Sequence, residues 1–159
     1  MSKHIVVGAG PIGTATSLLL AERGEEVVVV TRSGSGPTHP AITRTTADAS
    51  SSATMTDLAT GAVAIYNCVN PAYHRWPIDW PPIEGALLAA VEQSDAVLAT
   101  VRHLYAYGPG PPPRTWDLPL DAQGPKAHQR NQVGRTDPHG DYARRGATAR
   151  VRGAGWGGR

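Results

Sequence analysis

A glycine-rich turn between a short apolar run and a helix pattern constrains this chain more than any other feature. Residues 3–7 read KHIVV, the next six read GAGPIG, and residues 14–23 read TATSLLLAER. The first segment is typical of a buried strand, and the third has the pattern of a helix that stops before Gly24. A strand, a glycine turn and a helix in this order predict the start of a β–α–β unit.

Gly8, Gly10 and Gly13 fit the pattern G-x-G-x-x-G, with Pro11 and Ile12 between the last two. In such a turn the first glycine permits a tight bend, and the second lets a pyrophosphate approach the backbone. The third lets helix and strand pack closely. The phosphates bind free N–H groups at the start of the helix. A purely structural glycine turn is the alternative, because the chain contains 18 glycines. The position of the motif between strand and helix favours nucleotide binding.

Further strand-like and helix-like runs alternate along the chain. We expect strands over 26–31, 42–47, 62–69 and 96–101, and helices over 54–60 and 83–94, the last beginning near Pro81 and Pro82. Short connections between alternating strands and helices indicate a parallel sheet. The sequence therefore predicts an α/β fold, a Rossmann-type doubly wound parallel sheet of about five strands.

Charge divides the chain near residue 126. Residues 1–126 contain 8 Lys and Arg against 11 Asp and Glu, whereas residues 127–159 contain 7 Arg against 2 Asp. The second segment is rich in glycine and poor in large apolar residues, so it cannot bury enough surface to offset its ordering entropy. We expect one folded domain over 1–126 and a disordered or irregular basic tail over 127–159.

The tail has two interpretations. It is either a natural basic extension or the product of a truncated or frame-shifted gene. We favour the second, because the sequence after Lys126 becomes Arg/Gly/Ala-rich and loses all periodicity. Its arginines would bind phosphate backbones weakly, but it matches no nucleic-acid-binding module, so we expect no specific nucleic-acid partner.

Several classes of protein are disfavoured by composition. Cys68 is the single cysteine, which excludes an intrachain disulfide and leaves no partner for a zinc site. The longest apolar stretches are too short to cross a bilayer, and the first residues do not resemble a secretion signal. We expect a cytoplasmic protein with no bound metal and no membrane partner.

Three polar residues follow the second, third and fourth predicted strands. NAD- and FAD-binding turns usually place a carboxylate after the second strand, but this chain has Arg32 there. A guanidinium can pair with a 2′-phosphate, which favours NADP, with NAD as the second choice; a solvated loop arginine is the alternative. Asp48 either meets the adenine amino group or caps the following helix. Asn70 would border the nicotinamide.

Residues 73–80 read YHRWPIDW and follow the fourth predicted strand. This aromatic segment would contact a substrate at the edge of the crevice, or it would pin the next helix to the sheet. We favour the second interpretation, because Trp and Tyr bury large areas and the chain has no Phe.

With these residues in place, the chain resembles the NAD(P)-dependent epimerase/dehydratase family, the extended and atypical short-chain dehydrogenases/reductases. The matching features cover residues 3–126: GAGPIG, then Arg32, Asp48 and Asn70, then TVRHLYAYGP after the fifth predicted strand. The resemblance implies hydride transfer between the cofactor and a hydroxyl-bearing carbon of a small or sugar-like substrate. It also implies Tyr105 as the acid or base, with Thr100 as the nearby hydroxyl.

The chain departs from this family in two respects. The Tyr-x-x-x-Lys pair, in which lysine lowers the phenol pKa, is absent, because Tyr105 is followed four residues later by Pro109. Family members are also longer and carry a C-terminal substrate domain. We therefore expect weak or no turnover. A non-catalytic NAD(P)-binding or sensing module is the alternative function, and a fragment that cannot fold alone is a third possibility; the oligomeric state is left open.

Overall fold

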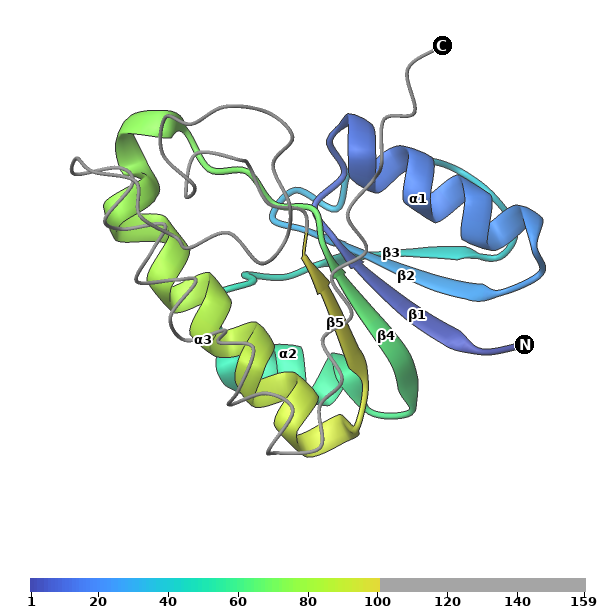
Figure 1. Cartoon of the computed structure of the whole chain (residues 1–159). Helices are drawn as coiled ribbons and strands as arrows, with labels where there is room; N and C mark the ends of the chain where they lie inside the picture. Colours follow the sequence, from blue (N-terminus) through green and yellow to red (C-terminus); the bar gives the residue numbers. More distant parts are fainter. Residues whose placement is uncertain (101–159) are drawn as a thin grey trace, which may run out of the picture.

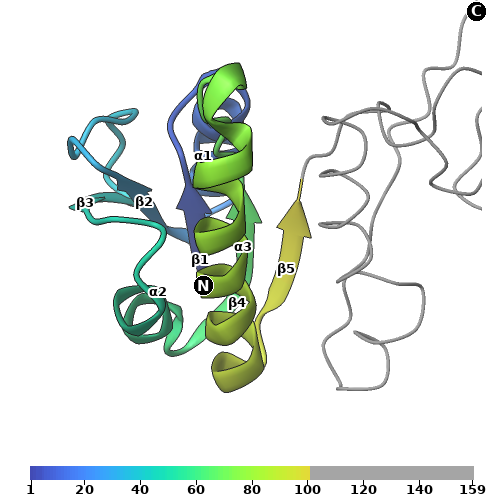
Figure 2. The same ribbon diagram turned by 90° about the vertical axis from the view of Figure 1, so that its left-hand side faces the viewer.

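The β-rich runs of the sequence form one five-stranded sheet in the computed structural model, which describes residues 1–100 (Figure 1). The strands are β1 (Lys3–Val7), β2 (Glu26–Thr31), β3 (Ile42–Thr46), β4 (Ala62–Asn67) and β5 (Val97–Thr100). All neighbouring strands pair in parallel, in the order β3-β2-β1-β4-β5. Figure 2 shows β1, β4 and β5 running in the same direction, so their carboxyl ends share one edge.

Helices cover both faces of this sheet. The helix α1 (Pro11–Glu22) lies on one face, and α2 (Ser52–Ala59) and α3 (Trp76–Ser94) pack together on the other (Figures 1 and 2). A short 3-10 turn, η1 (Tyr73–Arg75), leads into α3. The prediction of a doubly wound parallel sheet of five strands is confirmed.

Two apolar layers hold the helices to the sheet. Ile5 and Val7 of β1 point into the layer under α2 and α3, whereas Val6 points into the layer under α1. All three side chains are at most 1% exposed. The continuous apolar runs of β1 and β2 follow from this burial, because a strand covered on both faces needs apolar residues at every position.

Several predicted boundaries differ from those of the structure, and three of the differences have a consequence for the site or the packing. The first helix begins at Pro11 rather than at Thr14, because proline fits the first helical position, where its missing N–H costs nothing. The strand β4 ends at Asn67, so Cys68 follows the strand instead of lying within it. The third helix begins at Trp76, well before the predicted start at Pro81.

The early start of α3 has a packing explanation. Trp76 and Trp80 are spaced by one helical turn, and both are buried, with 5% and 4% of their surface exposed. Burying two indole rings offsets the hydrogen bonds that Pro81 and Pro82 cannot donate inside the helix. Propensity alone predicts the later start.

Candidate functional site

The candidate site lies where the strand order reverses, at the carboxyl ends of β1 and β4. In open parallel sheets, ligands bind in the crevice at this point. Backbone hydrogen bonds join the ends of the neighbouring strands: Gly8 N donates to Val30 O (2.9 Å), and Cys68 N donates to Val7 O (2.9 Å). The glycine turn that follows β1 is therefore held between the ends of β2 and β4.

Two of the three motif glycines are required by the fold. Gly8 has φ +96°, and a Cβ there would lie 3.0 Å from the carbonyl carbon and oxygen of Cys68. A Cβ on Gly13 would collide with the carbonyl oxygen of Gly8 and lie 3.2 Å from the Cβ of Cys68. Both positions lack room for any side chain, because helix α1 and the strand ends approach each other there.

Gly10 differs from the other two motif glycines. A Cβ on Gly10 would have no atom within 4 Å, and its φ of −70° is open to every residue. Neither a steric clash nor a left-handed backbone requires a glycine at this position. The space beside its backbone is therefore free for a group that approaches closely, as a pyrophosphate does in this motif.

The start of α1 adjoins this open space. Gly10 is the N-cap of α1 and provides no side-chain cap, and Pro11 carries no N–H. The N–H groups of Ile12 and Gly13 then have no acceptor within the helix. Thr14 N donates to Gly10 O (2.9 Å), which fixes the turn. This arrangement places two N–H donors and the positive end of the helix dipole beside the exposed Gly10.

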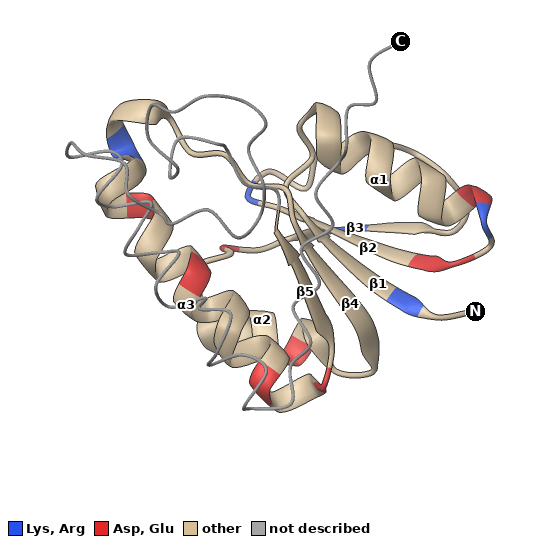
Figure 3. Cartoon of the chain, viewed as in Figure 1, with Lys and Arg blue, Asp and Glu red and all other residues tan. Residues whose placement is uncertain are grey.

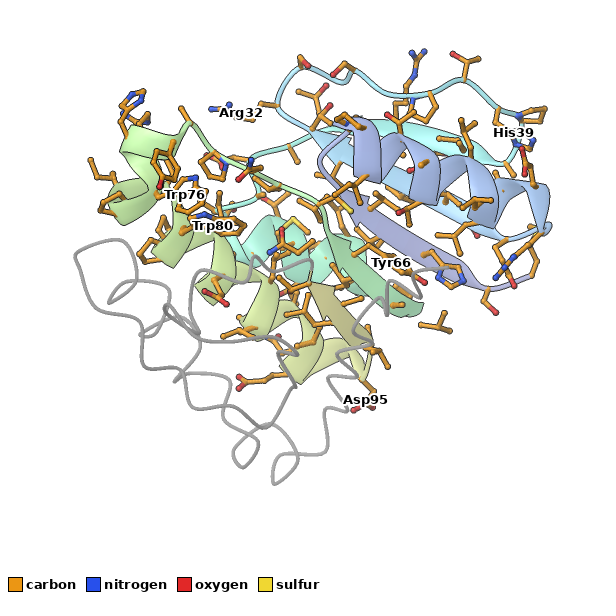
Figure 4. All side chains as sticks on the ribbon, turned by 45° about the horizontal axis from the view of Figure 1, so that its top comes forward. Arg32, His39, Tyr66, Trp76, Trp80 and Asp95 are labelled. Carbon is orange, nitrogen blue, oxygen red and sulfur yellow. The ribbon has the colours of Figure 1, made fainter. Side chains whose placement is uncertain are left out.

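Arg32 lies directly after β2, at the same edge of the sheet, and its side chain is exposed (Figure 4). The loop that follows it is ordered by its own hydrogen bonds, from Gly34 N to Thr31 O (3.4 Å) and from Thr31 Oγ1 to Ser35 O (2.9 Å). Within residues 1–100, Arg32 forms no ion pair. Its guanidinium is therefore available to an external anion.

Asp48 does not cap the following helix, so that interpretation is wrong. The N-cap of α2 is Ser51, whose Oγ accepts from Thr54 N (3.4 Å). The Asp48 carboxylate instead accepts from Ser50 N (2.9 Å) and Ser50 Oγ (2.8 Å), and these bonds, helped by the charge of Arg32, lower its pKa. Asp48 is exposed and stays ionised, so it retains free acceptor capacity at the sheet edge.

Asn70 is exposed and is the third residue after the end of β4. Sequence reasoning missed the asparagine that does end this strand. Asn67 is 2% exposed, and its Oδ1 accepts from Val69 N (3.3 Å), which bends the chain as it leaves the sheet. A polar residue in the last position of an otherwise apolar run was the available signal.

Cys68, the first residue after β4, lies beside both Gly8 and Gly13 of the glycine turn. Burial raises the pKa of its thiol, and a weaker contact with Thr16 opposes that shift. The thiol therefore stays protonated near neutral pH and acts as a small packing residue, not as a nucleophile.

The aromatic segment after β4 holds the start of α3. Trp76 Nε1 donates to Pro71 O (2.9 Å), and the Tyr73 and Trp76 rings meet edge-to-face with centroids 4.7 Å apart. Trp76 and Trp80 both point inward from the first turns of α3 (Figure 4). These contacts agree with the interpretation of the segment as an element that pins the helix.

The two residues assigned to catalysis are only partly described. Thr100 ends β5, where it pairs with Asn67 of β4, and is half-buried at the carboxyl edge. Tyr105 lies outside the described residues, as do residues 101–126 of the predicted domain and the predicted tail over 127–159.

Neither a metal centre nor a membrane-spanning helix occurs in the described part of the chain. Residues 1–100 contain no cluster of three or more histidine, cysteine, aspartate or glutamate side chains arranged to hold a metal ion. No helix among these residues combines the length and apolar character needed to span a membrane.

No protein-family model and no curated protein sequence matches the chain. Solved structures do match its fold. Uronate dehydrogenase from Agrobacterium tumefaciens superimposes with a TM-score of 0.73 at 16% identity, over 92% of this chain and 57% of that protein. UDP-glucose 4-epimerase from Brucella ovis in complex with NAD gives 0.73 at 19% identity, over 92% of this chain and 50% of that protein.

A third solved structure is the Bordetella bronchiseptica enzyme WbmH in complex with NAD⁺, with a TM-score of 0.71 at 19% identity, over 86% of this chain and 51% of that protein. The chain therefore spans about half the length of the proteins it matches. At these identities the comparison establishes the fold alone, a Rossmann-type fold that the uronate dehydrogenase and the two UDP-sugar epimerases share.

Proposed function

We propose that this chain binds a nicotinamide dinucleotide at the carboxyl ends of β1 and β4, with the pyrophosphate on the start of α1. The contrast among the three motif glycines carries this proposal. Gly8 and Gly13 have no room for a Cβ, whereas Gly10 has open space that packing does not require. The N–H groups of Ile12 and Gly13 face no helical acceptor, so they suit phosphate oxygens.

The proposed orientation of the cofactor follows the strand order. The adenosine half would extend over β2 and β3, toward Arg32 and Asp48, and the nicotinamide half would extend over β4 and β5, toward Asn70. Arg32 would pair with a 2′-phosphate, and Asp48 would accept from the adenine amino group. We therefore propose NADP as the preferred cofactor, although several of the solved structures with this fold are complexes with NAD.

For the reaction, we propose hydride transfer at a hydroxyl-bearing carbon of a small or sugar-like substrate, as in the epimerase/dehydratase family. Neighbours with this fold include a uronate dehydrogenase and a protein solved with UDP-glucuronic acid and NAD. The bound nicotinamide would supply or accept the hydride. Tyr105 would give or take the hydroxyl proton, and Thr100, at the end of β5, would hydrogen-bond the same oxygen.

Turnover by this chain would be weak. Tyr105 lacks the lysine four residues later that lowers a phenol pKa, because that position is Pro109. This same observation favours a second candidate function, a non-catalytic module that binds NAD(P) and signals its occupancy to a partner.

Calorimetric titration with NADPH and NADH tests the cofactor assignment. We expect binding of both, tighter for NADPH, and loss of that preference in Arg32→Asp. Equal affinities in the unsubstituted chain would discard the role of Arg32, and no binding of either would discard the proposed function.

A turnover assay separates the two candidate functions. The chain would be incubated with NADP⁺ or NAD⁺ and a panel of uronates, UDP-sugars and simple alcohols, and reduced cofactor followed by absorbance. Slow reduction that is abolished in Tyr105→Phe supports the enzyme. Binding without any reduction supports the sensing module.

A further inference from the structure

Asn67, the last residue of β4, carries a buried side-chain amide of which only the oxygen is used by the fold. The residue is 2% exposed, and its Oδ1 accepts from Val69 N at 3.3 Å. Because a backbone N–H only donates, this contact fixes which end of the amide is the oxygen. The nitrogen Nδ2 donates to no acceptor within residues 1–100, although it is not fully enclosed. A buried donor without an acceptor costs free energy, so this nitrogen suits an acceptor that comes from a ligand.

The register of the sheet places Asn67 between the glycine turn and the end of β5. Ile65 lies in the apolar layer under α2 and α3, so Asn67, two residues later, faces the same side of the sheet. Its Cα partners are Val7, which directly precedes the glycine turn, and Thr100, which ends β5. Leu98 packs against the same layer, so Thr100 shares this face with Asn67. The amide therefore lies at the carboxyl end of β4, which runs between β1 and β5, beside the hydroxyl-bearing Thr100 (Figure 1).

The other buried polar residues within residues 1–100 have partners in the fold. They are His4 and Ser17. Ser17 Oγ donates to Gly13 O (2.7 Å), and His4 Nδ1 lies 3.5 Å from Tyr66 Oη. Such internal partners are the rule for buried polar groups, and they leave the nitrogen of Asn67 unexplained.

We infer that Asn67 binds the nicotinamide half of the cofactor, with Nδ2 donating a hydrogen bond to an oxygen of the nicotinamide riboside. The inference rests on the proposed function, in which that half extends over β4 and β5 and the adenosine half over β2 and β3. The acceptors of the nicotinamide riboside are its carboxamide oxygen and its ribose hydroxyls. Because Val69 N already holds the amide, little side-chain freedom is lost when the bond forms. The bond would hold the nicotinamide half beside Thr100.

Asn67→Asp tests the inference, because it keeps an oxygen for Val69 N and replaces the donor nitrogen with an acceptor. Calorimetry would compare NADPH with two fragments: 2′-phospho-ADP-ribose, which lacks the nicotinamide ring, and 2′,5′-ADP, which lacks the second ribose as well. We expect the NADPH Kd to rise at least about tenfold, as for the loss of a hydrogen bond from a buried donor. The Kd of 2′,5′-ADP should change by less than about twofold, because this fragment does not reach β4. A loss that includes 2′-phospho-ADP-ribose assigns the bond to the ribose, and a loss confined to NADPH assigns it to the carboxamide.

Asn67→Ala is the second variant, because it adds no charge and serves where a buried carboxylate prevents folding. Folding of both variants is checked by urea denaturation, and we expect the same selective loss of NADPH over 2′,5′-ADP. An asparagine that acts only by bending the chain at Val69 gives another pattern. Asn67→Asp would then bind NADPH like the unsubstituted chain, or the variants would lose NADPH and 2′,5′-ADP equally. Either result would overturn the inference.

Gln93→Glu is the matched control for the change from amide to carboxylate. Gln93 is exposed in the last turn of α3, just before the start of β5, and so lies at the opposite edge of the sheet from Asn67. Figure 3 shows acidic positions already at this end of α3. We expect the Kd values of Gln93→Glu to equal those of the unsubstituted chain.

The outcomes separate this inference from the proposed function. If the unsubstituted chain binds neither NADPH nor NADH, the proposed function fails and the inference fails with it. If the unsubstituted chain binds NADPH and Asn67→Asp binds it equally tightly, only the inference fails.

Discussion

Two helices that begin at the carboxyl edge of the sheet, α1 and α2, start in opposite ways. The N-cap of α2 is Ser51, whose hydroxyl accepts from Thr54 N and contacts Thr54 Oγ1 at 2.9 Å. The N-cap of α1 is Gly10, which has no side chain, and no side-chain cap satisfies the helix.

This difference between the two helix starts indicates which of them can accept a ligand. A side-chain cap at a helix start satisfies N–H groups that would otherwise cost stability, and α2 has such a cap whereas α1 and α3 do not. The open start belongs to α1, beside the point where the strand order reverses, and the closed one follows the edge strand β3. Of these two helix starts, only that of α1 is open, and it lies at the point of the sheet edge where open parallel sheets bind ligands.

The largest expected effect on stability is that of Gly13→Ala, which adds a side chain where α1 and β1 approach each other. Gly13→Ala would drive a Cβ into the carbonyl oxygen of Gly8, so α1 must move away from β1. We expect a loss of roughly 3 kcal/mol in the free energy of unfolding, measured by urea denaturation. Gly85→Ala is the control, because a Cβ there, within α3, meets nothing within 4 Å. An unchanged midpoint for Gly13→Ala would show that the turn is looser than the structure describes.

A smaller effect on stability is expected when the side-chain cap of α2 is removed. Ser51→Ala removes the hydroxyl that accepts from Thr54 N, so the free energy of unfolding should fall by about 1 kcal/mol. Ser52→Ala makes the same change one residue later, at an exposed position inside the helix. If the two variants are equally stable by urea denaturation, the Ser51 hydroxyl does not stabilise the start of α2. The contrast between a capped α2 and an uncapped α1 would then be wrong.

The smallest expected effect is the acid sensitivity of the region before α2. The pKa of Asp48 is lowered in the fold, so its contribution to stability is present above its unfolded pKa of about 3.9 and is lost as the pH falls through the folded value. Because Asp48 is exposed, we expect at most roughly 0.5 kcal/mol. Urea denaturation between pH 6 and pH 3 should show a shallower decline for Asp48→Asn. An identical decline in both chains would contradict the role of the Ser50 hydrogen bonds.

The sequence is sufficient to predict the parts of the fold that depend on local pattern. The runs KHIVV and EVVVVT predict β1 and β2 because only a strand covered on both faces is apolar at every position. The glycine turn is equally predictable, because Gly8 and Gly13 are demanded by backbone geometry and close approach.

Features decided by tertiary contacts were not predictable in the same way. The start of α3 depends on the burial of Trp76 and Trp80, which outweighs the prolines that follow. The cap of α2 at Ser51 instead of Asp48 depends on where the chain turns after β3. The bidentate pair of Arg75 and Asp79 spans the boundary between η1 and α3, which local pattern did not place.

We propose that Gly10 is a glycine because a ligand needs the space beside its backbone, and NADPH titration of Gly10→Ala tests this claim most directly. The fold has room for the added methyl group, so Gly10→Ala should fold, with a free energy of unfolding within about 1 kcal/mol of that of the unsubstituted chain. We expect the NADPH Kd to rise at least about tenfold, a change of roughly 1.4 kcal/mol, because the methyl group occupies the space of the pyrophosphate. A folded Gly10→Ala that binds NADPH as tightly as Gly85→Ala would contradict the account.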